Sequence, residues 1–174
     1  MADVTIVYTD LVESTELNVK VGDDQFLELL HEHNEIVRRR LKVFNGVEFT
    51  HTGDGIGARF SESSNAVRFA LGLQADFDDA NTTHPSVAFL VRVGVARGEA
   101  MLDTDNMFGQ TVTRAARICA AASGGQVLAG EELTTGTDPM VASFSAAGAF
   151  ALKGFGISIP LFEAGPAEVA PVAG

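Results

Sequence analysis

Residues 8–17 read YTDLVESTEL, and residues 50–60 read THTGDGIGARF. Each stretch places one aspartate, Asp10 or Asp54, at the end of an expected β-strand. The second stretch predicts a hairpin over 47–60, because an Asp-Gly pair suits a tight turn with positive φ angles. If the first strand lies beside this hairpin, the two carboxylates reach the same edge of one sheet.

Each aspartate alone has an ordinary structural explanation. Asp54 precedes a glycine in a common turn, and Asp10 precedes LVEST, which suits a polar cap on the next helix. Together they favour a metal site, because two neighbouring carboxylates are costly unless a cation such as Mg²⁺ or Mn²⁺ lies between them. The turn after Asp10 also offers backbone N–H groups near Ser14 and Thr15, which suit phosphate oxygens.

Hydrophobic spacing assigns the remaining elements. The expected order is a strand at 4–9, a helix at 22–44, the hairpin, a helix through Phe77 that NTTHP ends, one or two strands over 86–102, a helix with Phe108, Val112, Ala115 and Cys119 on one face, and short strands at 126–129, 149–152 and 160–164. This order favours an α+β fold with helices packed on a largely antiparallel sheet. A doubly wound sheet fits less well, because the hairpin interrupts the alternation of strands and helices. We expect one domain over 1–165 and a flexible tail over 166–174, which is rich in small residues and proline.

The composition limits the classes of partner. Acidic residues outnumber basic ones by 23 to 12, for a formal charge of −11. This balance argues against nucleic acid or an anionic membrane surface, since both need a concentrated basic face, but it leaves a nucleotide possible. No apolar run is long enough for a membrane span and no signal peptide is evident, so we expect a cytoplasmic protein. The single cysteine, Cys119, is expected to be a small buried side chain rather than a nucleophile.

The other polar candidates are weaker. His31 and His33 are two apart on a helix and point to different faces, and His51 and His84 are expected in structural or solvent roles. No phosphate-binding loop motif with Gly-Lys-Ser/Thr and no nucleophile elbow occurs.

Three basic residues in the second half admit two interpretations each. Arg114 and Arg117 lie three apart on one expected helix, and Lys153 precedes a glycine at a strand end. Each side chain either lies on a solvated face or contacts an anion such as phosphate.

The combined pattern resembles the class III nucleotide cyclase catalytic domain, which is the adenylyl and guanylyl cyclase family. The resemblance runs from about Thr5 to Ala164 and is carried by YTDLVEST, GDDQFLELLHEHNEIVRRRL, TGDGIGARF, RVGVARGE, FGQTVTRAARI, GGQVLAG and LKGF with PLFEA. It implies a ferredoxin-like βαββαβ core and a dimer with active sites at the interface. The implied reaction is attack of the ribose 3′-hydroxyl on the α-phosphate of a nucleoside triphosphate, with release of pyrophosphate.

The resemblance also implies residue roles. Asp10 and Asp54 match the metal-binding aspartates, with the Leu11 backbone beside them, and two Mg²⁺ or Mn²⁺ ions per site are implied. The triphosphate positions are Val12, Glu13, Ser14, Thr15 and Lys153. Arg117 of the partner subunit matches the arginine that stabilises developing charge.

Three positions depart from the family pattern. Thr50 stands where the purine-selecting lysine is expected, Asn106 where the purine-reading aspartate is expected, and Thr113 where the ribose-positioning asparagine is expected. Two hypotheses follow. The first is a homodimeric cyclase, weak or atypical in turnover, that prefers ATP to GTP. The second is a silent pseudocyclase that binds nucleotide and metal or regulates a partner, including a related cyclase domain in a heterodimer.

Overall fold

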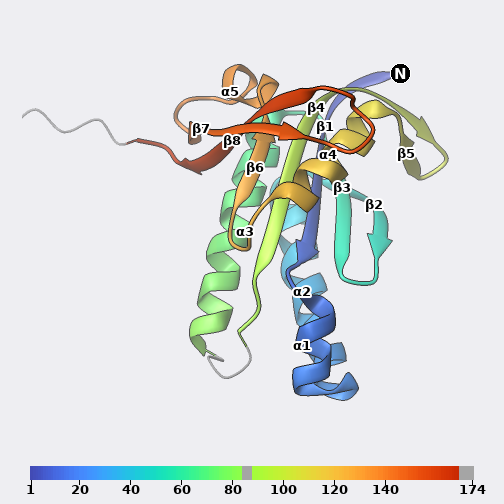
Figure 1. Ribbon diagram of the computed structural model, residues 1–174, viewed down its shortest axis with the longest axis vertical. Helices are drawn as coiled ribbons and strands as arrows, with labels where there is room; N and C mark the ends of the chain where they lie inside the picture. The colour runs from blue at the N-terminus through green and yellow to red at the C-terminus, as the bar shows by residue number, and fades with distance from the viewer. Residues whose placement is uncertain (84–87, 169–174) are drawn as a thin grey trace, which may run out of the picture.

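The computed structural model describes residues 1–83 and 88–168, so His84 and most of the expected tail lie outside the described part. The elements in chain order are β1 (Ala2–Leu11), α1 (Ser14–Val21), α2 (Asp23–Val43), β2 (Val47–Thr52), β3 (Gly55–Phe60), α3 (Ser63–Thr83), β4 (Val91–Asp103), β5 (Asn106–Phe108), α4 (Gln110–Ala121), β6 (Val127–Gly130), α5 (Glu132–Gly136), β7 (Ala142–Ala151) and β8 (Ser158–Pro166). Figure 1 shows them with these labels.

One twisted sheet runs through the molecule in the order β2-β3-β1-β4-β6-β8-β7, and β5 pairs with the C-terminal end of β4. Strand β1 lies between β3 and β4 and pairs antiparallel with both. Only the β4–β6 pair is parallel among the described strands. The segment from β1 to β4 therefore forms the expected ferredoxin-like core, and the fold is α+β with a mostly antiparallel sheet.

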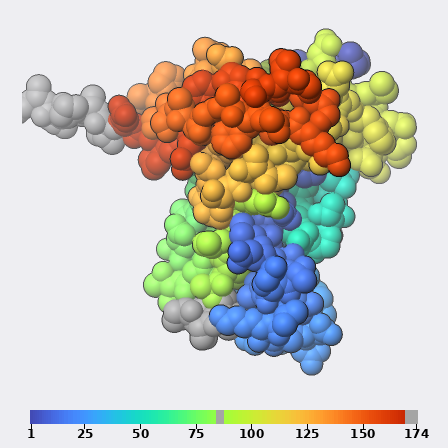
Figure 2. All heavy atoms as spheres, in the orientation of Figure 1, coloured from blue at the N-terminus to red at the C-terminus, as the bar shows by residue number. Residues whose placement is uncertain are grey.

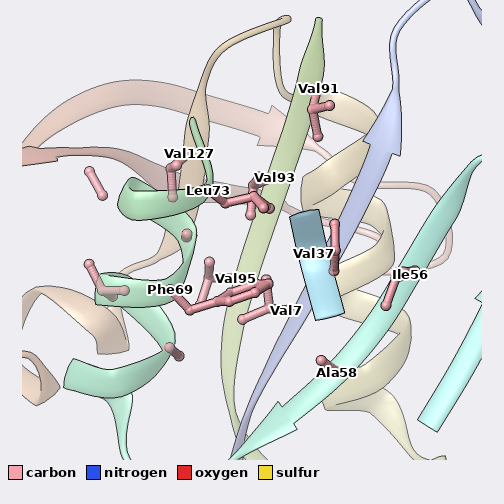
Figure 3. Close-up of a cluster of buried hydrophobic side chains, with 14 of the residues drawn as sticks. Val7, Val37, Ile56, Ala58, Phe69, Leu73, Val91, Val93, Val95 and Val127 are labelled. Atoms are coloured by element: carbon pink, nitrogen blue, oxygen red, sulfur yellow. The ribbon is translucent and has the colours of Figure 1, made fainter. Parts of the chain in front are cut away.

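The sheet buries both faces. Alternate residues of β1 point to opposite sides, as strand geometry requires. Val7 belongs to the cluster under α2 and α3, whereas Ile6 belongs to the cluster under α4. Figure 3 shows the first cluster, in which valines from β1, β4 and β6 meet Phe69 and Leu73 of α3. Because helices cover both faces, polar side chains that could bind a ligand are expected at the edges of the sheet and at the ends of its strands.

The hairpin at β2 and β3 is present, but its expected turn geometry is wrong. Thr52 pairs with Gly55, so the loop is Gly53 and Asp54, and neither flanking glycine has a positive φ angle. Gly55 has a different reason to be glycine, because a Cβ there would collide with the Thr9 carbonyl oxygen. The glycine lets β3 approach β1 closely beside Asp10.

Two other expectations are corrected. Helix α3 does not end at Asn81 but continues to Thr83, because the Asn81 side chain exchanges two hydrogen bonds with the Phe89 backbone and holds the helix end in place. Phe108 does not join the α4 face. It lies in β5 and is about half exposed (49%), because Gly109, with φ of 131°, separates the strand from the helix.

The space-filling view shows β7 and β8 lying across one end of the molecule, while α1 forms the opposite end (Figure 2). The sequence between them on this face includes α4, which rests on β4 and β1. None of the helices in the described ranges is both long enough and apolar enough to cross a membrane.

Candidate functional site

Asp10 and Asp54 meet at one edge of the sheet. The β1–β3 register pairs Asp10 with Gly55, the residue after Asp54. The Leu11 amide donates to the Asp54 carbonyl at 3.0 Å, which joins the end of β1 to the hairpin turn. The Ser14 hydroxyl donates to Asp54 Oδ2 at 2.7 Å. The strand end, the hairpin turn and the first residue of α1 therefore form one cluster.

Arg92 of β4 completes this cluster from the other side of β1. It is the register partner of Asp10 on β4. Its Nε and Nη2 atoms both donate to Asp10 Oδ2, at 3.0 and 2.7 Å, and its Nη1 donates to the Ala120 carbonyl at 2.9 Å. The guanidinium supplies a positive charge beside the two carboxylates.

The pKa of Asp10 is raised above its usual value. Burial is the main cause, and the charge of Asp54 adds to it, while the hydrogen bond from Arg92 opposes both. A bound cation would stabilise the ionised form of Asp10, because it would neutralise the repulsion between the Asp10 and Asp54 carboxylates, which burial strengthens.

The donor set fits Mg²⁺ or Mn²⁺. Both carboxylates have Oδ2 engaged by protein donors, and within the described residues no hydrogen bond reaches either Oδ1 atom. The Leu11 carbonyl and these carboxylates are hard oxygen ligands, which such ions prefer. No group of three or more His, Cys, Asp or Glu side chains suited to a metal occurs in the part of the chain that the structure describes. Oxygen donors from outside the chain, such as water, would therefore complete the coordination, as is usual for Mg²⁺.

The turn from Leu11 to Thr15 leads into α1. The Val12 amide donates to the Leu90 carbonyl at 2.9 Å, so it is already used inside the fold. Glu13 takes a left-handed conformation with φ of 53° and starts the helix. The amides of Ser14 and Thr15 lie in the first turn, where N–H groups lack intrahelical acceptors and attract anions. Among the residues expected to donate hydrogen bonds to phosphate, Ser14 and Thr15 therefore have the best-placed amides.

A second group of expected residues lies elsewhere. Thr113 and Lys153 line an open pocket of about 540 Å³ together with Gly109, Gln110, Gly154 and Phe155, and neither aspartate lines it. Arg117 is exposed and lies one helical turn beyond Thr113 on α4. Thr113 and Lys153 therefore lie apart from the two aspartates. Below, the metal group is Asp10, Asp54 and Ser14, and the α4 group is Thr113, Arg117 and Lys153.

The three atypical residues are engaged locally. The Asn106 side-chain oxygen accepts from the Met107 amide at 2.9 Å, and the Thr113 hydroxyl donates to the Gly109 carbonyl at 3.3 Å. The Thr50 methyl group lies against Gly57, where a Cβ would be 2.6 Å from it.

Other candidates have structural roles. Arg114 is about one-quarter exposed and is already engaged within the fold, because it donates to Glu132 and to the Arg97 carbonyl, both at 2.6 Å. Burial raises the pKa of the Cys119 thiol to about 12, which suits an inert side chain. His33 is fully buried against Phe77, as a structural histidine would be.

Sequence reasoning assigned Arg92 no role. The available signal was one arginine inside the apolar run FLVRVGV. A charge there needs a partner, because an unpaired charge in a buried strand is costly. The sequence does not say that the partner is Asp10, 82 positions away.

The chain also matches known proteins. The family described as the adenylate and guanylate cyclase catalytic domain matches residues 1–162. A putative adenylate cyclase 3 of Rhizobium meliloti is 36% identical over 100 residues, which are 57% of this chain and 17% of that protein. The uncharacterized protein Rv0891c of Mycobacterium tuberculosis is 31% identical over 157 residues, which are 87% of this chain and 52% of that protein.

The fold is also that of solved cyclases. The adenylyl cyclase CyaB from P. aeruginosa superposes with a TM-score of 0.83 at 16% identity, covering 99% of this chain and 97% of that one. The chain spans about half or less of the length of the two relatives above. From the family match over nearly its whole length, the chain belongs to the class III adenylate and guanylate cyclase catalytic domains.

Proposed function

We propose that this domain converts a nucleoside triphosphate, ATP in preference to GTP, into a 3′,5′-cyclic nucleotide and pyrophosphate. The reaction would take place with Mg²⁺ or Mn²⁺ at a site shared by two copies of the chain. The observation that carries the proposal is the cluster of Asp10, Asp54 and Ser14 at one strand edge, in which no hydrogen bond from the described residues reaches Oδ1 of either aspartate.

In the proposed reaction the ribose 3′-hydroxyl releases its proton to solvent water, and its oxygen bonds to the α-phosphorus. The bond from that phosphorus to the α–β bridging oxygen breaks, and pyrophosphate leaves. Bound metal would lower the pKa of the 3′-hydroxyl and neutralise charge on the phosphates. Asp10 and Asp54 would hold the metal, and the first turn of α1 would orient the triphosphate through the Ser14 and Thr15 amides.

The separation of the two residue groups supports a second copy. Lys153 lines a pocket that neither aspartate lines, and Arg117 is an exposed cation for which no hydrogen bond to either aspartate occurs among the described residues. The β4–β5 hairpin also exposes Met101, Leu102 and Phe108, each about half accessible, beside a pocket of about 480 Å³. Apolar side chains gathered on a projecting hairpin are typical of a contact surface. A second copy seated there would bring its own α4 group to the metal group.

The preference for ATP rests on the relatives. Several are named adenylate cyclases, including those of Rhizobium meliloti and Neurospora crassa. The side chains of Thr50 and Asn106 do not indicate whether adenine or guanine is preferred.

The proposal is tested by cyclic nucleotide formation from ATP and from GTP with Mn²⁺. Asp10→Asn should lower the rate by about 10²-fold or more, as loss of one transition-state contact does. Asp78→Asn, on the exposed side of α3, is the matched control and should keep the wild-type rate. Absence of product from either nucleotide at high enzyme concentration, with measurable triphosphate binding, would contradict the proposal.

The same absence would support the second candidate, a silent pseudocyclase that binds nucleotide or regulates a partner. The specific observation behind it is the local use of the Asn106 and Thr113 side chains. These polar atoms bond to neighbouring backbone and would have to leave it to reach a purine or a ribose.

A further inference from the structure

Three N–H donors of Arg92 bond to acceptors on two different elements, β1 and α4. Two N–H groups meet one oxygen of Asp10, and the third meets the carbonyl of Ala120 at the end of α4. The side chain is about one-quarter exposed (28%), as is that of Asp10 (25%), so the pair is partly shielded from water. One guanidinium therefore joins the metal group of a chain to the helix that carries its Arg117.

The Ala120 carbonyl is one of the last carbonyls of α4. Such carbonyls have no N–H donor within the helix. The Ala122 amide donates to Ile118 and Cys119, and Arg92 serves Ala120. The last turn of α4 contains no basic residue of its own. Arg92 thus provides from β4 the positive charge that favours a helix C-terminus.

Helix α4 lies directly on β4 beside Arg92. A Cβ on Gly94 would fall 2.6 Å from Cys119 Cα, so the helix backbone touches the strand. The Cys119 thiol also contacts the Arg92 carbonyl at 3.6 Å. Strand and helix therefore touch through backbone atoms close to the point where the Arg92 side chain reaches the Ala120 carbonyl.

We propose that Arg92 is a positioning residue that couples the metal site at Asp10 to the C-terminal turn of α4. This rests on the proposed function, in which Asp10 holds metal and Arg117 of α4 serves the partner subunit's site. When a metal draws on the Asp10 carboxylate, the attraction between Asp10 and Arg92 weakens, and the interaction of Arg92 with the Ala120 carbonyl strengthens. Loading of one active site would then steady the helix that completes the other.

The test is hydrogen exchange of the full chain with and without Mn²⁺, with no turnover required. In the wild type, Mn²⁺ should slow exchange in the hairpin at 50–60, and it should slow the last turn of α4 by about threefold. Arg92→Lys keeps the charge but has one nitrogen, which cannot span Asp10 and Ala120 as the planar fork does. In this variant the hairpin should still respond to Mn²⁺, and α4 should not. Arg68→Lys, on the exposed side of α3, is the matched control and should behave as the wild type.

The outcomes are separable. A wild type in which the hairpin responds and α4 does not would overturn the coupling while leaving the metal site in place, and so would an equal α4 response in Arg92→Lys. If the Lys variant loses the hairpin response, Arg92 belongs to the metal site itself and the coupling is wrong. If neither segment of the wild type responds, the metal site of the proposed function fails, and the coupling falls with it.

Discussion

Thr50, Asn106 and Thr113 lie where the resemblance to the family leads us to expect lysine, aspartate and asparagine. A threonine is too short and carries no charge, so it cannot replace a lysine that reaches a purine. The Asn106 side chain also accepts from the Met107 amide, and the Thr113 hydroxyl donates to the Gly109 carbonyl. In the proposed function, these three side chains would account for a weak or atypical reaction without any change in the fold.

Restoring the three residues should raise the rate. The combined change Thr50→Lys, Asn106→Asp and Thr113→Asn is expected to increase cyclic nucleotide formation by about 10²-fold or more, with gains that do not simply add. The assay is product formation from ATP and GTP with Mn²⁺. The same triple variant carrying Asp10→Asn should show no gain. If the triple variant alone shows none, the residue matching is wrong.

His33 should make stability depend on pH. Burial lowers the pKa of His33, partly opposed by its hydrogen bond with Asn34. The neutral ring is therefore favoured in the fold, and its contribution is complete above the unfolded pKa of about 6.5 and lost as pH falls through the folded pKa. Urea unfolding of the wild type between pH 7 and 5 should show a slope that His33→Gln reduces, by at most about 1.4 kcal/mol per pH unit.

The control for this experiment is close in sequence. His31 lies two residues away on α2 and is exposed. His31→Gln should leave the pH dependence unchanged. An equal slope in the wild type and His33→Gln would contradict the assignment of the buried histidine.

At the scale of elements, α4 shows what a pattern predicts and what it omits. The spacing of Val112, Ala115 and Cys119 correctly predicts the buried face of the helix. It does not predict how near the helix comes to the sheet. That distance is set by Gly94, because glycine leaves room for the helix backbone.

Gly94→Ala should therefore destabilise the domain. Its methyl group would meet the Cys119 backbone, which cannot turn aside as a flexible side chain would. We expect a loss of about 3 kcal/mol or more in the free energy of unfolding, measured in urea. Gly53→Ala is the matched control, since nothing lies within 4 Å of a Cβ there. A change of similar size at both positions would rule out close packing as the cause.

At the scale of the whole molecule, the two residue groups predict activity shared between chains. Asp10→Ala removes the metal group of a chain, and Arg117→Ala removes its α4 group. Each variant alone should be inactive, whereas a mixture should recover about a quarter of the wild-type activity, because half of randomly paired dimers contain one intact site. Cyclic nucleotide formation after mixing measures this.

A mixture of two metal-group variants is the control for this experiment. Asp10→Ala mixed with Asp54→Ala disables the metal group in both chains and should recover nothing. Recovery there, or none in the first mixture when the wild type is active, would contradict a site built from two chains.

Most of the fold follows from local patterns. The strand before Asp10, the amphipathic helix α2 and the hairpin before Phe60 are each visible in neighbouring residues, because periodicity and turn residues act over short distances. Their order was enough to indicate an α+β sandwich, and the motifs within them carried the resemblance to the cyclases. The helix α1 and the continuation of α3 to Thr83 were missed; the end of α3 depends on hydrogen bonds between the Asn81 side chain and the Phe89 backbone, which helical spacing does not reveal.

The sequence alone indicated that Asp10 and Asp54 end two strands that belong together. The three-dimensional structure was needed to bring Arg92 to Asp10 and Ser14 to Asp54, across separations of 82 and 40 residues. It was also needed to show that the Val12 amide is already used and that Arg114 binds Glu132. The physical reason is that strand order and register determine these partners, and no local pattern carries that information.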